Sequence, residues 1–191
     1  MLIAIAKDEA FNFTYRANID ALAAKGEIIY FSPLRDKHLP DCDFLYLPGG
    51  YPELFANQLS ANESMRNSIK NYAERGGHIY AECGGFMYLC NDIDGTPMAG
   101  VLPMSATMQG ARLHLGYRRA LFGNTELRGH EFHYSTIVDA PLPPNVTVIR
   151  NQRSAANTPV ATEIYRYLNV TAGYTHWYWA ENAAHLLEQI M

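Results

Sequence analysis

The sequence predicts an α/β fold of three layers, in which helices flank a mostly parallel sheet. In the first 90 residues, short apolar runs typical of buried strands alternate with amphipathic segments of helical periodicity. Glycine-rich turns separate these segments. With 191 residues and 48% hydrophobic content, the chain can bury one sizeable core, so we expect residues 1–191 to form a single domain.

A strand, a helix and a second strand are predicted between residues 1 and 31. Met1–Ala6 is an apolar run, and residues 15–25 carry apolar side chains at helical spacing before Gly26 ends the helix. Glu27–Phe31 has the apolar composition of a strand. This order predicts a parallel βαβ unit.

Two further strands are predicted to lead into glycine-rich turns. Phe44–Leu47 runs directly into Pro48-Gly49-Gly50, and an amphipathic helix over residues 62–75 is stopped by Gly76-Gly77. The strand that follows, His78–Ala81, ends just before Cys83. We therefore expect Cys83 at a sharp strand-to-helix turn, because the residues after it have helical character.

The chain beyond Gly95 becomes richer in predicted β-structure. Candidate strands lie at residues 111–122, 131–138 and 146–150. Ala172–Tyr178 is a short aromatic segment, predicted to be a last strand or a loop that delivers His176. A final helix is expected at Ala183–Ile190.

Composition excludes several classes of function. Nineteen acidic residues against fifteen Lys plus Arg give a net charge of -4 without a basic run, so we expect no nucleic-acid partner. Apolar runs fall short of the roughly 20 residues of a membrane helix, and no secretory signal opens the chain, so we expect a cytoplasmic location and no membrane. Three cysteines without zinc-like spacing predict neither a disulfide framework nor a metal site.

Cys83 is the candidate nucleophile. A helix amino terminus carries partial positive charge and free N–H groups, which stabilise a thiolate over a thiol. Cysteine is also a common buried residue, and that alternative applies to Cys42 and Cys90, which lack comparable neighbours. Glu82 before Cys83 and two glycines after it favour the nucleophile.

Two glycines are candidates for stabilising a developing oxyanion. Gly50 would present its backbone at the carboxyl edge of the sheet, where open α/β folds bind ligands. Gly84 follows the nucleophile, and its N–H is the natural second donor in acyl transfer. An ordinary turn at Gly50 is the alternative, because glycine is common in turns.

Seven segments taken together resemble the carboxyl-terminal glutaminase domain of cobyrinic acid a,c-diamide synthases, a branch of the class I triad glutamine amidotransferases. The resemblance covers nearly the whole chain and implies a flavodoxin-like fold. It rests on KDEAFNF at Lys7–Phe13, FSPLRD at Phe31–Asp36, LPGGYPEL at Leu47–Leu54, AECGGFMYL at Ala81–Leu89, PMAGVLP at Pro97–Pro103, GHEFHYS at Gly129–Ser135 and AGYTH at Ala172–His176.

The resemblance implies roles for particular residues. Cys83 would attack the side-chain amide of glutamine to form a thioester and release ammonia, with His176 as the base. Tyr134 and Ser135 would present backbone groups to glutamine, and His133 would shape the pocket while remaining the second candidate for the base. An ordinary half-buried strand is the alternative for this segment.

One position departs from the pattern of most triad amidotransferases. The family pattern is His-x-Glu, whose carboxylate orients the imidazole, whereas His176 is followed by Trp177 and Tyr178. The resemblance to the cobyrinate branch is closer here, because that branch also lacks the glutamate. Tyr178, Glu82 or a backbone carbonyl are the candidates for holding the imidazole.

The resemblance also implies partners. Ammonia would pass to a synthetase domain or subunit that uses ATP and Mg²⁺ to activate the a and c carboxylates of cobyrinic acid, the tetrapyrrole acceptor. The chain contains no Gly-x-x-x-x-Gly-Lys-Ser/Thr loop, so we expect the synthetase domain to be absent from it and no cofactor to bind here. Residues 7–13 would lie near the interface with the synthetase, unless they form a solvated first helical turn. A homodimer is a further possibility.

Two other functions remain open from the sequence. An amidotransferase of the same fold could serve cobyric acid, a sirohydrochlorin-type tetrapyrrole or a cell-wall lipid precursor. A catalytically silent interaction domain is the other alternative, which Tyr178 makes worth testing.

Overall fold

The computed structural model describes residues 1–138, 140–180 and 182–191. The first half contains β1 (Leu2–Ala6), α1 (Arg16–Ala23), β2 (Glu27–Phe31), β3 (Phe44–Leu47), η1 (Pro52–Phe55), α2 (Ala56–Ala61), α3 (Glu63–Glu74), β4 (His78–Glu82) and α4 (Gly84–Leu89). The second half contains β5 (Cys90–Ile93), β6 (Thr96–Pro97), β7 (Leu102–Thr107), β8 (His114–Phe122), β9 (Thr125–His133), β10 (Thr136–Ile137), β11 (Val146–Ile149), β12 (Arg153–Ser154), β13 (Ile164–Tyr167), β14 (Val170–Gly173), β15 (His176–Tyr178) and α5 (Ala183–Ile190).

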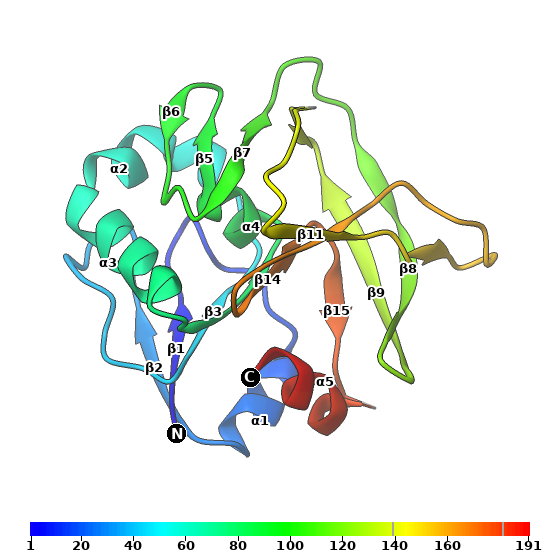
Figure 1. The fold of residues 1–191 in the computed structure, drawn as a ribbon. Helices are drawn as coiled ribbons and strands as arrows, with labels where there is room; N and C mark the ends of the chain where they lie inside the picture. The colour runs from blue at the N-terminus through cyan, green and yellow to red at the C-terminus, as the bar shows by residue number, and fades with distance from the viewer. Residues whose placement is uncertain (139, 181) are drawn as a thin grey trace.

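A seven-stranded sheet in the order β11-β13-β14-β4-β3-β1-β2 forms the centre of the molecule (Figure 1). Neighbours from β14 through β4, β3 and β1 to β2 pair in parallel, while β13 and β11 continue the sheet antiparallel. The predicted mostly parallel sheet is therefore confirmed. Parallel strands end at the same edge, which places the turns after β3, β4 and β14 side by side.

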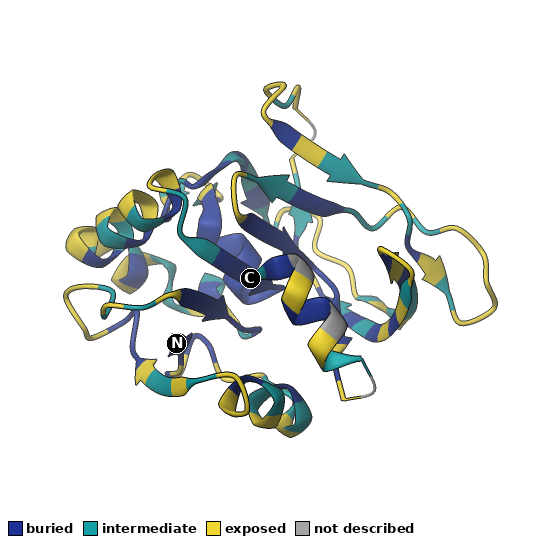
Figure 2. Cartoon of the chain, turned by 60° about the horizontal axis from the view of Figure 1, so that its bottom comes forward, coloured by how far each residue is buried: buried dark blue, intermediate teal, exposed yellow. Residues whose placement is uncertain are grey.

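Each face of the central sheet buries its own core. Leu22 of α1 and Leu186 and Leu187 of α5 pack on one face, whereas Met65 of α3 and Phe86 of α4 pack on the other. The sheet is mostly buried and the outer helix faces are exposed (Figure 2). Removal of these apolar side chains from water drives assembly of the three predicted layers. In the described part of the chain, no helix is long and apolar enough to cross a membrane.

The β-rich half differs from the prediction in detail. It forms two additional four-stranded sheets, β10-β7-β5-β6 and β12-β8-β9-β15. The strand expected over residues 131–138 is wrong in its bounds, because β9 starts at Thr125 and the later residues form the separate β10. Phe122 pairs with Thr125 across Gly123-Asn124, and Gly123 has φ 59°. Such a two-residue turn requires positive φ and starts the second strand at once.

The segment Ala172–Tyr178, predicted to be a last strand or a loop, includes the end of one strand and the whole of a second strand in another sheet. β14 ends at Gly173 in the central sheet, and β15 begins at His176 in the sheet of β8 and β9. The chain therefore changes sheets at Tyr174-Thr175. This change brings His176 opposite His130 of β9.

Candidate active site

Cys83 occupies a strained strand-to-helix turn. It follows the last residue of β4 and caps α4 with φ 48° and ψ -105°, a conformation that is costly for a residue with a Cβ atom. Its N–H donates to the carbonyl of Gly173 at 2.8 Å, and its own carbonyl accepts from Met87 at 2.9 Å. The predicted sharp turn at Cys83 is confirmed, and the surrounding backbone bonds hold it.

Strain at position 83 predicts an inverted order of stability between two variants. Cys83→Gly should be more stable than Cys83→Ala by about 1 kcal/mol, because glycine adopts this conformation without a Cβ clash. At Cys90, where φ is -63°, the order should be the usual one, with alanine more stable than glycine. Thermal unfolding of the four variants measures this. Equal stability of the two variants at position 83 would show that the turn is unstrained.

His176 and Cys83 face one cavity. The cavity has a volume of about 280 Å³, and its lining includes Cys83, His176, Gly50, His130 and Phe132. The residues meet because β14 runs parallel to β4 with Gly173 opposite Glu82. The next turn of chain after β14 therefore carries the imidazole to the carboxyl end of β4.

Glu82 lies beside the imidazole and is not among the residues that line the cavity. Its Oε2 atom is 3.7 Å from Nδ1 of His176, and the glutamate side chain is 2% exposed. The carboxylate accepts hydrogen bonds from three donors: Tyr46 Oη at 2.9 Å, Tyr80 Oη at 3.0 Å and the N–H of Trp177 at 3.0 Å. These bonds fix the carboxylate so that it faces Nδ1 of His176.

Tyr178, the other side-chain candidate for orienting the imidazole, lies elsewhere. It is 42% exposed, and its ring packs edge-on against Tyr15 with centroids 5.2 Å apart. Of the two predicted side chains, the structure brings Glu82 to His176. Glu82 lies two residues after Tyr80 on β4 and shares its face of the sheet, where Tyr80 donates to it.

Charge around the imidazole favours its protonated form. Burial opposes protonation, but the nearby Cys83 and the Glu82 carboxylate 3.7 Å from Nδ1 outweigh burial and raise the pKa of His176 from 6.5 to about 9. His176 is therefore an imidazolium at neutral pH. Its contribution to folding stability is complete below about pH 6.5 and is lost as the pH rises through about 9.

Aromatic neighbours hold the ring of His176 in place. Phe13 contacts it edge-on with centroids 4.6 Å apart, and His130 stacks on it at 5.0 Å. On the remaining side, a Cβ atom on Gly49 would lie 2.2 Å from Cε1 of His176, so only glycine fits. Burial, together with the positive charge of His176, lowers the pKa of His130.

Phe13 and His130 are site residues that the sequence interpretation did not assign. Alternation in GHEFHYS was the available signal, because residues two apart on a strand share a face. His130 and Phe132 accordingly face the Cys83 cavity together.

The two candidate oxyanion residues are close neighbours. Gly84 is the first residue of α4, where N–H groups have no acceptor within the helix. A Cβ atom on Gly84 would lie 2.7 Å from the carbonyl oxygen of Gly50. Their backbones therefore meet beside Cys83.

The predicted glutamine-contacting residues lie at the end of β9 and in the loop after it. His133 does not line the Cys83 cavity; its ring stacks on Tyr174 with centroids 3.8 Å apart, and Nδ1 donates to the carbonyl of Ser135 at 2.8 Å. Ser135 is buried, with Oγ 2.9 Å from Tyr174 Oη, and Tyr134 is 40% exposed. Of the two candidate bases, the geometry places His176 at the nucleophile.

Residues 7–13 form a loop that borders the site. The alternative expectation of a helical turn is wrong, since the first helix begins at Arg16. Asp8 is buried and accepts hydrogen bonds from four groups within the fold, including the N–H groups of Ala10 and Leu34. Phe13 pairs with Gly49 through the backbone. Asp8 therefore stabilises the loop itself, whereas Phe13 at its other end contacts His176.

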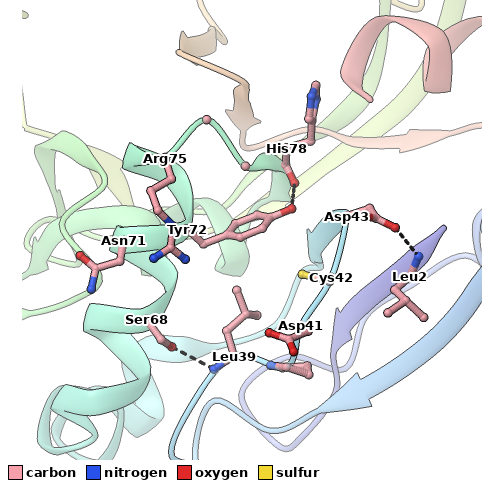
Figure 3. A pocket seen from close by; sticks show the side chains of 13 residues that line it. Leu2, Leu39, Asp41, Cys42, Asp43, Ser68, Asn71, Tyr72, Arg75 and His78 are labelled. Atoms are coloured by element: carbon pink, nitrogen blue, oxygen red, sulfur yellow. Dashed lines mark hydrogen bonds between the residues drawn. The ribbon is translucent and has the colours of Figure 1, made fainter.

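A larger cavity, of about 630 Å³, lies at the amino-terminal ends of the strands (Figure 3). Leu2, Asp43, Tyr72 and His78 are among its lining residues. It contains none of the predicted site residues. Size alone therefore does not locate the chemistry in this chain.

Comparison with known proteins gives consistent matches. The sequence model of the CobB/CobQ-like glutamine amidotransferase domain matches residues 2–184. A cobyrinate a,c-diamide synthase of Clostridium acetobutylicum is 47% identical over 144 residues, covering 71% of this chain and 33% of that protein. The cobyrinate a,c-diamide synthase of Synechocystis sp. is 41% identical over 192 residues, covering 93% of this chain and 39% of that protein.

Solved structures resemble the fold at low sequence identity. A glutamine amidotransferase crystal structure superposes with a TM-score of 0.63 at 18% identity, covering 98% of both chains. The structure of PurLQS from Thermotoga maritima gives 0.63 at 20% identity, covering 92% of this chain and 86% of that one. These likenesses bear on the fold, and they agree with the flavodoxin-like architecture expected from the sequence.

Proposed function

The chain belongs to the CobB/CobQ-like glutamine amidotransferase domain family, and on this basis we propose that it hydrolyses glutamine with Cys83 as its nucleophile. One observation carries the proposal. A cysteine in a strained strand-to-helix turn shares a cavity with a buried imidazole that a fixed carboxylate faces. Nucleophile, base and orienter in this order are the parts of a triad.

The proposed reaction has two halves. Sγ of Cys83 attacks the carboxamide carbon of glutamine as a thiolate, its proton being held on His176, and the carbonyl oxygen becomes an oxyanion facing the N–H groups of Gly50 and Gly84. His176 gives its proton to the leaving nitrogen, so that ammonia departs and a thioester remains. His176 then takes a proton from water, whose oxygen attacks the thioester to release glutamate and return the sulfur.

Glu82 is proposed as the third member of the triad. Its negative charge stabilises the imidazolium, and its three hydrogen bonds prevent the carboxylate from turning away. Tyr134 and Ser135 are proposed to contact glutamine through their backbone groups, and His133 is proposed to support the pocket wall from the opposite face of β9, where it stacks on Tyr174.

The acceptor and partner belong to a larger assembly. The chain spans about a third of the length of the curated relatives it matches, which are named cobyrinate a,c-diamide synthases. We propose that ammonia from this domain amidates the a and c carboxylates of cobyrinic acid in a synthetase domain or subunit that uses ATP and Mg²⁺. A cytoplasmic location and a homodimer remain predictions from the sequence.

Covalent labelling tests the proposal directly. Diazo-oxo-norleucine, an electrophilic glutamine analogue, should modify Cys83 alone and abolish glutamate release from glutamine. Peptide mass spectrometry locates the label, with Cys42 and Cys90 as internal controls in the same chain. Label on another residue, or no label in a chain that still releases glutamate, would remove Cys83 from the mechanism.

A further inference from the structure

A second polar cavity lies behind the strand that borders the Cys83 cavity. Its volume is about 340 Å³, toward the lower end of the about 300–1,000 Å³ typical of small-molecule sites. Alternation along β9 separates the two cavities: His130 and Phe132 face Cys83, whereas Glu131 and His133 face the second cavity.

Glu131 lines this second cavity and has an unpaired carboxylate oxygen. The residue is 1% exposed, and its Oε2 atom pairs with Arg118 at 2.6 Å. Its Oε1 atom is buried and accepts no hydrogen bond from the residues that the structure describes. Nε of Arg118 and Nε2 of His114 are also buried, and neither has a hydrogen-bond partner among the described residues. An unpaired buried carboxylate oxygen is costly, so a ligand that donates to it would be bound favourably.

Local packing shows that the ion pair is built into the fold. Arg118 reaches Glu131 across Gly116, where a Cβ atom would lie 2.5 Å from Nη1 of Arg118. Gly116 is opposite Glu131 in the β8–β9 ladder. Well-packed apolar residues at such positions are often as stabilising as a buried ion pair. Fold stability alone therefore gives little reason for this arrangement.

The polar groups of the second cavity divide by hydrogen-bonding character. Nδ1 of His133 donates to the Ser135 carbonyl, which leaves Nε2 as an acceptor 3.9 Å from Glu131. Burial lowers the pKa of His133 to about 4, so the ring is neutral at neutral pH. Acceptors thus gather at Glu131 and His133, while the exposed Arg112 adds a positive charge to the lining.

We propose that this second cavity binds a free α-amino acid. The ammonium group is held by Oε1 of Glu131 and Nε2 of His133, and the carboxylate is held by Arg112. Glutamine and glutamate both carry these two groups, and they are the two candidate ligands to be distinguished. The proposal goes beyond glutamine hydrolysis, because the cavity contains neither Cys83 nor His176.

Calorimetric titration after blocking Cys83 tests for this site. The chain is alkylated with diazo-oxo-norleucine, so that the Cys83 cavity is occupied and glutamine is not consumed. L-glutamate or L-glutamine should still bind, and the amino acid that binds more tightly is the ligand of the second cavity. Glutarate, which lacks the ammonium group, should bind at least tenfold more weakly. Equal binding of glutarate, or no binding of either amino acid to the blocked chain, would overturn the proposal without affecting the role of Cys83.

Matched variants locate the binding. Glu131→Gln should weaken amino-acid binding at least tenfold, and Arg112→Gln several-fold. Glu126→Gln is the control, since Glu126 lies on the same strand and pairs with Arg119 at 2.7 Å but is 40% exposed; it should leave binding unchanged. Because Arg112 is exposed, Arg112→Gln decides the matter if Glu131→Gln fails to fold. Unchanged affinity in Arg112→Gln, or in a folded Glu131→Gln, contradicts the assignment.

Discussion

Replacement of His176 by alanine is expected to lower kcat for glutamine hydrolysis by about 10⁴- to 10⁶-fold, as loss of the histidine does in other triads. The leaving nitrogen would lack its proton donor, and water would lack its base. Labelling of Cys83 by diazo-oxo-norleucine should also be abolished at neutral pH. Glutamate release and mass spectrometry measure the two effects.

Two further measurements separate loss of the imidazole from loss of structure. His133→Ala removes a histidine that is also buried, but one that faces the second cavity, so labelling should only weaken. Free imidazole should restore part of the activity of His176→Ala, because the substitution opens space at the cavity wall. Abolished labelling in His133→Ala together with retained labelling in His176→Ala would exchange their roles.

Glu82→Gln is expected to lower kcat by about 10²- to 10⁴-fold while labelling of Cys83 slows rather than stops. Glutamine keeps the size of the side chain but lacks the charge that stabilises the imidazolium. Because Glu82 helps to raise the pKa of His176 to about 9, its removal should lower the pH at which the imidazolium loses its proton. The alkaline fall in activity should therefore move to lower pH.

Steady-state rates across the pH range measure both effects of Glu82→Gln. Glu74→Gln is a matched control, since Glu74 accepts a hydrogen bond from Tyr167 Oη at 3.0 Å on the exposed surface; it should leave kcat and the pH profile unchanged. Tyr80→Phe, which removes one donor to Glu82, should have a smaller effect of the same sign. An unshifted alkaline limb in Glu82→Gln would exclude Glu82 as the orienting carboxylate.

Local sequence patterns predicted the parallel half of the fold closely. The strands at Glu27–Phe31 and Phe44–Leu47 and the helix at Ala183–Ile190 have the expected bounds. Apolar patterns identify such elements because a helix buries one apolar face and a central strand is a continuous apolar run. The hairpin of β13 and β14 was not predicted, because its turn places Leu168 at φ 49°, where a leucine gives no turn signal.

Local sequence was enough to predict that Cys83 stands between a strand and a helix, since glycine and apolar spacing act over a few neighbouring residues. The groups that surround the thiol could be identified only from the folded chain. The parallel register of β14 on β4 and the change of sheet at Tyr174-Thr175 bring His176 to Cys83 and Glu82. Contacts of this kind depend on how strands far apart in the chain pair, and the energy that selects the pairing comes from packing of whole faces.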